Sequence, residues 1–174
     1  MTKRILVALD GTKEGETIVP KLEELILGKL HGSESEITLV RVVPIVNFNV
    51  LSEDERAQLP YTESDRKELT DEAQSYLEKV ANNLRVKNFN VNTMVRIGQA
   101  ANEIVNAAHE INADLIAMAT SGKGSLIRWA IGSVSDKVIR LEGKIPVLAV
   151  HAKPKKDETS VLLPGSLQSL TKHS

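Results

Sequence analysis

The chain contains no cysteine, so disulfide bonds, thiolate metal sites, iron–sulfur clusters and cysteine nucleophiles are excluded. Aromatic residues make up only 3% of the 174 residues, too few for the stacking platforms that bind single-stranded nucleic acid. Neither sign of charge dominates, because 22 Lys and Arg stand against 23 Asp and Glu. A net charge of −1 provides no general attraction to nucleic acid or to anionic membranes. We therefore expect neither nucleic acid nor a membrane among the partners.

Long apolar runs are also missing, since none approaches the ~20 residues needed to cross a bilayer. The apolar run that starts at Ile5 is ended by Asp10, well before the length of a signal-peptide core. We expect a cytoplasmic location. The composition, 41% hydrophobic and 26% charged, is that of an ordinary globular domain. No metal site built from protein side chains is expected, because the four histidines are scattered without ligand spacing, at His31, His109, His151 and His173.

Short β-branched segments alternate with longer segments of helical periodicity. The predicted strands are Arg4–Leu9, Ile37–Val43, Val91–Ile97, Asp114–Ala119 and Pro146–His151. Helical patterns cover 18–26, 62–84, 100–111 and 133–141, with Pro20 expected to kink the first helix or delay its start. Strands separated by helices form parallel sheets with right-handed crossovers. The sequence therefore predicts a three-layer α/β fold with a doubly wound five-stranded parallel sheet of order 3-2-1-4-5.

We expect one domain over residues 1–151, interrupted by a flexible insertion at 44–62 that is rich in proline, asparagine and acidic residues. Residues 152–174 form a polar linker followed by a short apolar patch. One interpretation is a tail that docks on the body or on a second subunit, and the other is a frayed end.

In a sheet of this order, ligands bind outside the carboxyl ends of the strands, where the winding reverses between the first and fourth strands. Residues 9–12 and 118–122 leave the sheet there. Asp10 could accept a hydrogen bond from an adenine amino group or a ribose hydroxyl. It could equally start the turn or cap the following helix.

The most distinctive segment is the glycine-rich stretch 119–136, which runs from a strand end to a helix start. The helix that opens at Gly132-Ser133 has unpaired amide groups, and together with the nearby Lys123 these could hold a phosphate chain. The alternative is that Ser133 only caps the helix, with Asp136 at the capping-box position. The stretch matches neither the P-loop nor the dinucleotide fingerprint, and no nucleophile–base arrangement is apparent. We therefore expect no catalytic residues.

Several segments taken together resemble the universal stress protein family across residues 1–151. They are 5–12, 39–43, 113–118, 132–138 and 145–150. The resemblance implies an adenine nucleotide alpha hydrolase-like fold and an ATP-binding regulatory protein of the stress response. The nucleotide-binding branch of the family has Gly, two residues, Gly, nine residues, then Gly-Ser/Thr. Gly122 and Gly132-Ser133 match this motif, whereas Ala119 replaces its first glycine, which we expect to weaken binding rather than abolish it.

By resemblance, Asp10 would contact the adenosine end of the nucleotide and the Val42 backbone would contact the adenine. The full set of implied nucleotide-binding residues is Ala8, Leu9, Asp10, Val42, Met118, Ala119, Gly122, Lys123, Gly132, Ser133, Val134 and Ser135. The ligand would be ATP, or AMP or ADP, and Mg or Mn could lie between the phosphates without a dedicated protein cage.

The resemblance also implies a homodimer formed through Val147–His151. Two other functions stay open. One is an interaction module that has lost its nucleotide. The other is a slow ATPase, or an enzyme that phosphorylates its own Ser121, Ser125 or Ser133, although a general base and metal-binding carboxylates are missing.

Overall fold

The computed structural model describes residues 2–26, 35–44, 63–120 and 133–151. Its sheet is entirely parallel, with strand order β3-β2-β1-β4-β5, as the sequence predicts. The strands are β1 Lys3–Ala8, β2 Ser35–Pro44, β3 Asn90–Gly98, β4 Leu115–Thr120 and β5 Val147–His151. The helices are η1 Gly15–Thr17, α1 Ile18–Leu25, α3 Glu63–Arg85, α4 Ala100–Glu110 and α5 Ser133–Leu141. The predicted insertion beyond Pro44 and the predicted tail lie outside the described residues.

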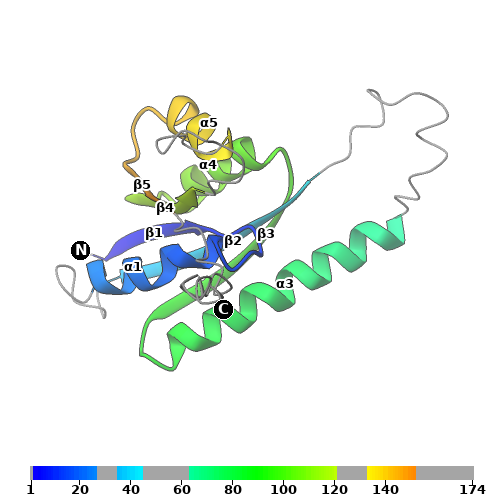
Figure 1. Cartoon of the computed structure of the whole chain (residues 1–174), viewed down its shortest axis with the longest axis horizontal. Coiled ribbons are helices and arrows are strands. Elements are labelled where there is room, and N and C mark those ends of the chain that lie inside the picture. Colours follow the sequence, from blue (N-terminus) through cyan, green and yellow to red (C-terminus); the bar gives the residue numbers. More distant parts are fainter. Residues whose placement is uncertain (1, 27–34, 45–62, 121–132, 152–174) are drawn as a thin grey trace, which may run out of the picture.

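The sheet is the middle of three layers (Figure 1). On one face, η1, α1 and α3 cover a core that includes Ile5 and Val7, and on the other α4 and α5 cover a core that includes Leu6. Successive residues of a strand point to opposite faces, so a central strand must be apolar on both. All three residues are at most 1% exposed. β1 is therefore the centre of the fold, and its carboxyl end lies at the point where the winding reverses.

Helix α1 shows why its proline is tolerated. The 3-10 turn Gly15–Thr17 comes first, and the α-helix starts at Ile18, so Pro20 falls in the first turn. Amides of the first turn have no intrahelical acceptor, so the missing N–H of proline costs nothing there. The late start that the sequence suggested is what the structure has.

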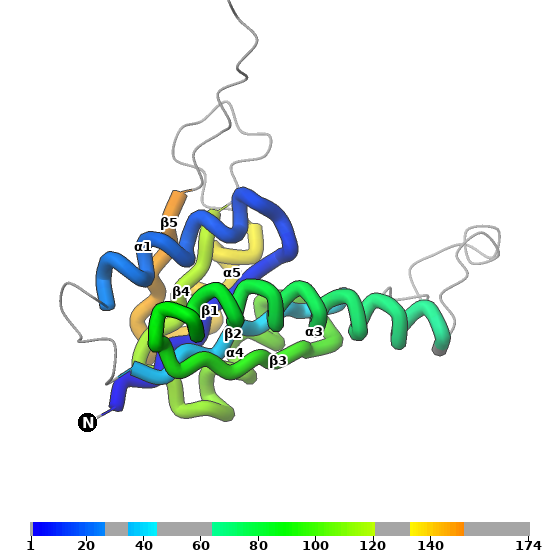
Figure 2. The backbone as a smooth tube through the Cα atoms, turned by 90° about the horizontal axis from the view of Figure 1, so that it is seen from below, coloured from blue at the N-terminus to red at the C-terminus, as the bar shows by residue number. Residues whose placement is uncertain are grey.

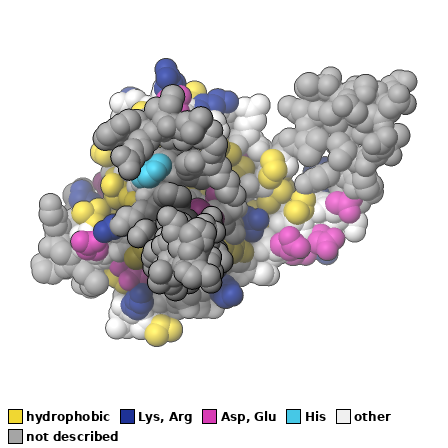
Figure 3. Space-filling model, viewed as in Figure 1, with side chains coloured by type: hydrophobic (Ala, Val, Ile, Leu, Met, Phe, Trp, Pro, Cys, Tyr) yellow, Lys and Arg dark blue, Asp and Glu magenta, His cyan; other side chains and the backbone are white. Residues whose placement is uncertain are grey.

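Helix α3 is longer than the sheet that it covers. Its buried residues run from Ala73 to Leu84, while its first turns carry exposed acidic side chains at Glu68, Asp71 and Glu72. Figure 2 shows these turns extending past the sheet, and acidic groups gather over them in Figure 3. In the described parts of the chain, no helix is long and apolar enough to cross a membrane.

Candidate functional site

The sheet register brings the candidate residues of β1, β2 and β4 to one edge. Ala8 pairs with Val40 of β2 on one side and with Met118 of β4 on the other. The amide of Leu9 still donates to the carbonyl of Val40, at 2.9 Å. Asp10 is therefore the first residue after β1 that is free of the sheet, and it lies at the reversal of winding.

The candidate residues divide between the two faces of this edge. Ala8, Val42 and Met118 pack with the core under α4 and α5. Leu9 and Ala119 pack on the opposite face, with the core under α1 and α3. A ligand on the α4–α5 side therefore meets the first three side chains, and one that extends across the carboxyl edge also meets Leu9 and Ala119.

Asp10 organises the turn that follows β1. Its Oδ1 accepts hydrogen bonds from the Thr12 amide at 2.9 Å and from the Thr12 hydroxyl at 2.6 Å. That hydroxyl accepts in turn from the amide of Gly15, at 2.9 Å. The turn-forming alternative for Asp10 is thus confirmed for one oxygen. Its Oδ2 accepts no hydrogen bond from any described residue that the structure records.

The guanidinium group of Arg41 lies against this turn. Gly11 has φ +84°, and a Cβ at this position would lie 2.9 Å from the guanidinium carbon of Arg41. The same carbon lies 5.2 Å from the ring centre of Tyr76 on α3, within cation–π range. Burial, followed by the carboxylates of Glu16 and Asp10, raises the pKa of Tyr76 above its usual range. The positive charge of Arg41 therefore partly offsets the negative charge of Glu16 and Asp10.

Ala119 takes the place of a motif glycine without backbone strain. Among the described residues other than glycine, only Asn88 and Asn112 have positive φ, so Ala119 lies in an ordinary region. A position that required positive φ would disfavour alanine, and Ala119 is not such a position. The remaining reason for expecting weak binding is the space that the methyl group occupies. The next residue, Thr120, is buried, and its hydroxyl lies 3.3 Å from Nδ1 of His151 at the end of β5.

Helix α5 begins at Ser133, next to this edge. Ser133 and Val134 are exposed, whereas Ser135 is buried, at 2% exposure. Asp136 accepts from Nε of Arg140 at 2.8 Å, an ion pair one turn along the helix. Gly122, Lys123, Gly132, Ser121 and Ser125 lie outside the described residues.

The described residues contain no group of three or more His, Asp or Glu side chains that could hold a metal ion. The carboxylates at this edge, Asp10 and Glu16, instead engage neighbouring side chains, Thr12 and Lys13. A divalent ion here would depend on ligand phosphates and water for its coordination.

A doubly wound parallel sheet, in which ligands bind outside the carboxyl ends of the strands, defines a class of small-ligand-binding α/β domains. The family model described as "Universal stress protein family" matches residues 1–151, and the chain belongs to this family. A Staphylococcus aureus (strain USA300) protein assigned by name to the universal stress proteins is 32% identical over 139 residues, 79% of this chain and 78% of that one.

Solved structures share the fold. Hypothetical protein MJ0577 is 28% identical with TM-score 0.65, covering 88% of this chain and 99% of that chain. A universal stress protein in complex with cAMP is 18% identical with TM-score 0.57, covering 87% and 98%. A family protein from Arabidopsis thaliana with AMP bound is 12% identical with TM-score 0.59, covering 91% and 97%. At these last two identities the likeness establishes the fold only.

Sequence reasoning did not find Arg41, Tyr76 or Gly15 as residues that contact or support the Asp10 turn. A signal existed for Arg41, the one charged residue in the predicted strand Ile37–Val43. Tyr76 falls within the predicted helix 62–84 and carries no separate signal. Their contact joins a strand to a helix further along the chain, and no local pattern encodes such a contact.

Proposed function

We propose that this protein is a nucleotide-responsive regulator of the stress response that binds ATP, or ADP or AMP, at the carboxyl edge of β1 and β4. The observation that carries the proposal is the carboxyl edge of the sheet, where Asp10 leaves β1 beside Val42 and Met118. The complexes of family structures with cAMP and AMP support adenine nucleotides as the ligand class.

The two oxygens of Asp10 have separate roles in this proposal. Oδ1 remains in the turn with Thr12, and Oδ2 accepts from the adenosine part of the ligand. The Val42 backbone lies along the adenine. The phosphates lie toward Ser133 and Ser135, where the first amides of α5 favour negative charge, and toward Gly122, Lys123 and Gly132. Bound Mg or Mn would neutralise phosphate charge.

Calorimetry with ATP, ADP and AMP, and with GTP as a control, tests the proposal. Asp10→Asn keeps an oxygen for the turn but replaces the acceptor Oδ2 with a donor. The variant should weaken adenine-nucleotide binding about 10- to 100-fold, because a hydrogen bond to a charged group contributes about 1.5–3 kcal/mol. Asp71→Asn, on the exposed part of α3, is the matched control and should bind like the wild type.

Ala119→Gly separates this proposal from its rivals. If the methyl group only crowds the ligand, the variant binds more tightly than the wild type, and Lys123→Ala weakens ATP more than AMP. Absence of binding in both the wild type and Ala119→Gly would overturn the proposal and favour an interaction module. Phosphate release from ATP that is lost in Ser133→Ala would instead indicate an enzyme.

We further propose a homodimer through β5. Among the described strands, β5 pairs only with β4, which leaves one edge open. Its side chains Val147, Leu148 and Val150 are half-buried and Ala149 is exposed. An apolar strand edge favours pairing with a second chain.

A further inference from the structure

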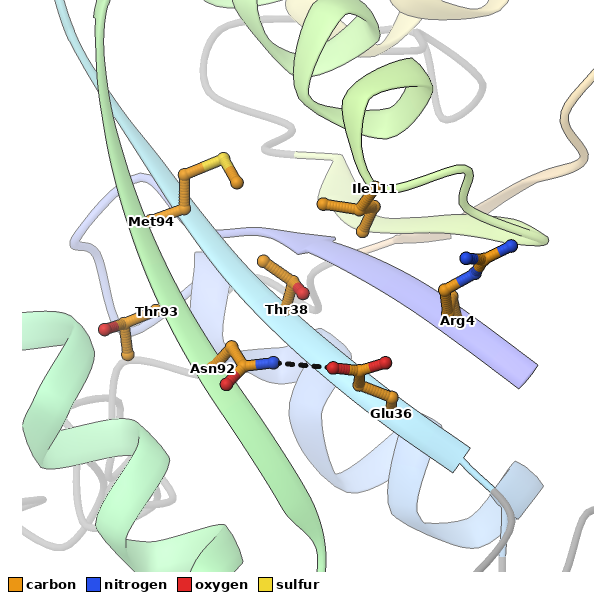
Figure 4. A pocket seen from close by; sticks show the side chains of 7 residues that line it. All are labelled: Arg4, Glu36, Thr38, Asn92, Thr93, Met94 and Ile111. Carbon is orange, nitrogen blue, oxygen red and sulfur yellow. Dashed lines mark hydrogen bonds between the residues drawn. The ribbon is translucent and has the colours of Figure 1, made fainter. Parts of the chain in front are cut away.

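A cavity lies at the opposite end of the sheet from Asp10, on the face covered by α4 (Figure 4). Its volume is about 310 Å³, at the lower end of the ~300–1,000 Å³ range of ligand pockets. Arg4 of β1 and Glu36 of β2, which are register partners, both line it. The cavity therefore has room for a small molecule and shares no residue with the proposed nucleotide site.

The polar floor of the cavity follows from the alternation of β2. Glu36 and Thr38 face the cavity. Ile37 and Leu39, which alternate with them along the strand, are buried on the opposite face. On the cavity side α4 ends at Glu110, and Ile111 just beyond it forms a wall. The helix layer thus stops before it covers this part of the sheet.

Two opposite charges line the cavity without pairing. Arg4 and Glu36 are both described residues, and they form no ion pair with each other. In Figure 4 the Arg4 side chain points toward the segment after α4, and Glu36 turns toward Asn92. The Asn92 side-chain amide donates to Oε1 of Glu36 at 2.8 Å, which fixes that carboxylate. A separated cation and anion match a ligand that carries both signs of charge.

Thr38 adds a hydroxyl to the floor. The residue is only 5% exposed, and its hydroxyl has no recorded hydrogen bond to any described residue. Solvent still reaches this hydroxyl from the cavity, so a ligand there can replace a water molecule as its partner. Met94 and Ile111 give the same cavity an apolar side.

From this arrangement we propose a second small-molecule site that binds an α-amino acid with a medium-sized apolar side chain. The carboxylate of the ligand pairs with Arg4 and its ammonium group with Glu36. The Thr38 hydroxyl hydrogen-bonds to the same polar end, and the side chain packs on Met94 and Ile111. This site is independent of nucleotide binding.

Titration of the full chain with L-leucine tests the proposal, by calorimetry and by following the backbone amide resonances of Thr38 and Asn92. Two analogues each lack one charge: 4-methylpentanoate has no ammonium group and isopentylamine has no carboxylate. Leucine should saturate, and each analogue should bind at least ~10-fold more weakly, because each loses a charge-assisted hydrogen bond. Leucine should bind equally well when AMP is present.

Variants assign the contacts. Arg4→Gln and Glu36→Gln should each weaken leucine at least ~10-fold, and Thr38→Val should weaken it without lowering the melting temperature. Lys3→Gln is the matched control, because Lys3 adjoins Arg4 but pairs with Asp114 at 3.7 Å, and it should bind leucine like the wild type. No saturable change up to ~10 mM leucine, or analogues that bind the wild type as well as leucine does, would overturn the proposal.

Discussion

Gly15→Ala tests whether the Asp10 turn depends on the absence of a side chain at position 15. A Cβ there would lie 2.2 Å from Oδ1 of Asp10 and 3.0 Å from its Cγ. No stable structure holds the first contact, so Asp10 or the backbone of η1 must move. The movement breaks the hydrogen bonds from the Thr12 amide and hydroxyl, which are 2.9 and 2.6 Å long.

The expected cost has two parts. Overpacking a filled position costs about 1–3 kcal/mol. The two broken hydrogen bonds add little, because Asp10 is exposed and water can replace Thr12 as its partner. We therefore expect Gly15→Ala to lower the free energy of unfolding by about 2 kcal/mol, which lowers the melting temperature by roughly 4–8 °C for a domain of this size.

A double-mutant cycle assigns this cost to the named contact. Asp10→Ala removes the atoms that the new methyl group would strike, so adding Gly15→Ala to it should cost less than ~1 kcal/mol. Urea unfolding followed by circular dichroism measures all four proteins. A coupling free energy of at least ~1 kcal/mol supports the reasoning. If the two substitutions are additive to within ~0.5 kcal/mol, the steric account is wrong.

Three other predictions follow from the described contacts. Gly11→Ala should lower the melting temperature by several degrees, since it combines φ +84° with a contact to Arg41, whereas Gly143→Ala should not, because nothing lies within 4 Å of its Cβ. For Glu142, burial alone would raise the pKa, but the amides of Ile145 and Lys144 and the imidazole of His109, 2.8 Å away, outweigh it and lower the pKa. A carboxylate with a lowered folded-state pKa stabilises the protein above its unfolded value near 4.5, and this stability is lost as the pH falls through the folded value. As the pH falls toward the pKa of Glu142, the free energy of unfolding of Glu142→Gln should therefore decrease less steeply than that of the wild type. Equal slopes for the two proteins would contradict the assignment. Ala149→Lys should convert the proposed dimer to a monomer in size-exclusion chromatography with light scattering, and a dimer that persists would place the interface elsewhere.

Much of the fold could be predicted because its determinants are local. Ile5, Leu6 and Val7 are apolar on both faces, which marks a central strand, and the alternation of strands with helices determines the parallel order. The edge at which ligands bind follows from that order, so the position of Asp10 could be predicted as well. Each of these conclusions needs only the type of a residue and the spacing of its neighbours.

Two features could not be predicted in this way. One is the cavity lined by Arg4 and Glu36, and the other is the contact of Arg41 with Gly11 and Tyr76. Whether Arg4 pairs with Glu36 depends on side-chain direction, and whether Thr38 is covered depends on where α4 stops above it. Both are properties of packing between segments that lie far apart in the sequence. A polar residue in a strand is a visible signal, but it does not say whether a helix covers it.

The structure shows that the two interpretations of Asp10, as a turn residue and as a ligand-binding residue, do not exclude each other. A carboxylate that forms a turn is usually considered unavailable to a ligand, but here the turn takes only Oδ1. Fixing one oxygen restricts the rotation of the carboxylate, so Oδ2 is held in place before a ligand arrives. Binding then loses less side-chain entropy than it would with a mobile aspartate. By the same argument, Thr12→Val, which removes the hydroxyl at 2.6 Å, should weaken nucleotide binding although this side chain holds Asp10 and has no assigned contact with the ligand. Equal affinities of Thr12→Val and the wild type would show that the turn does not prepare Asp10 for binding.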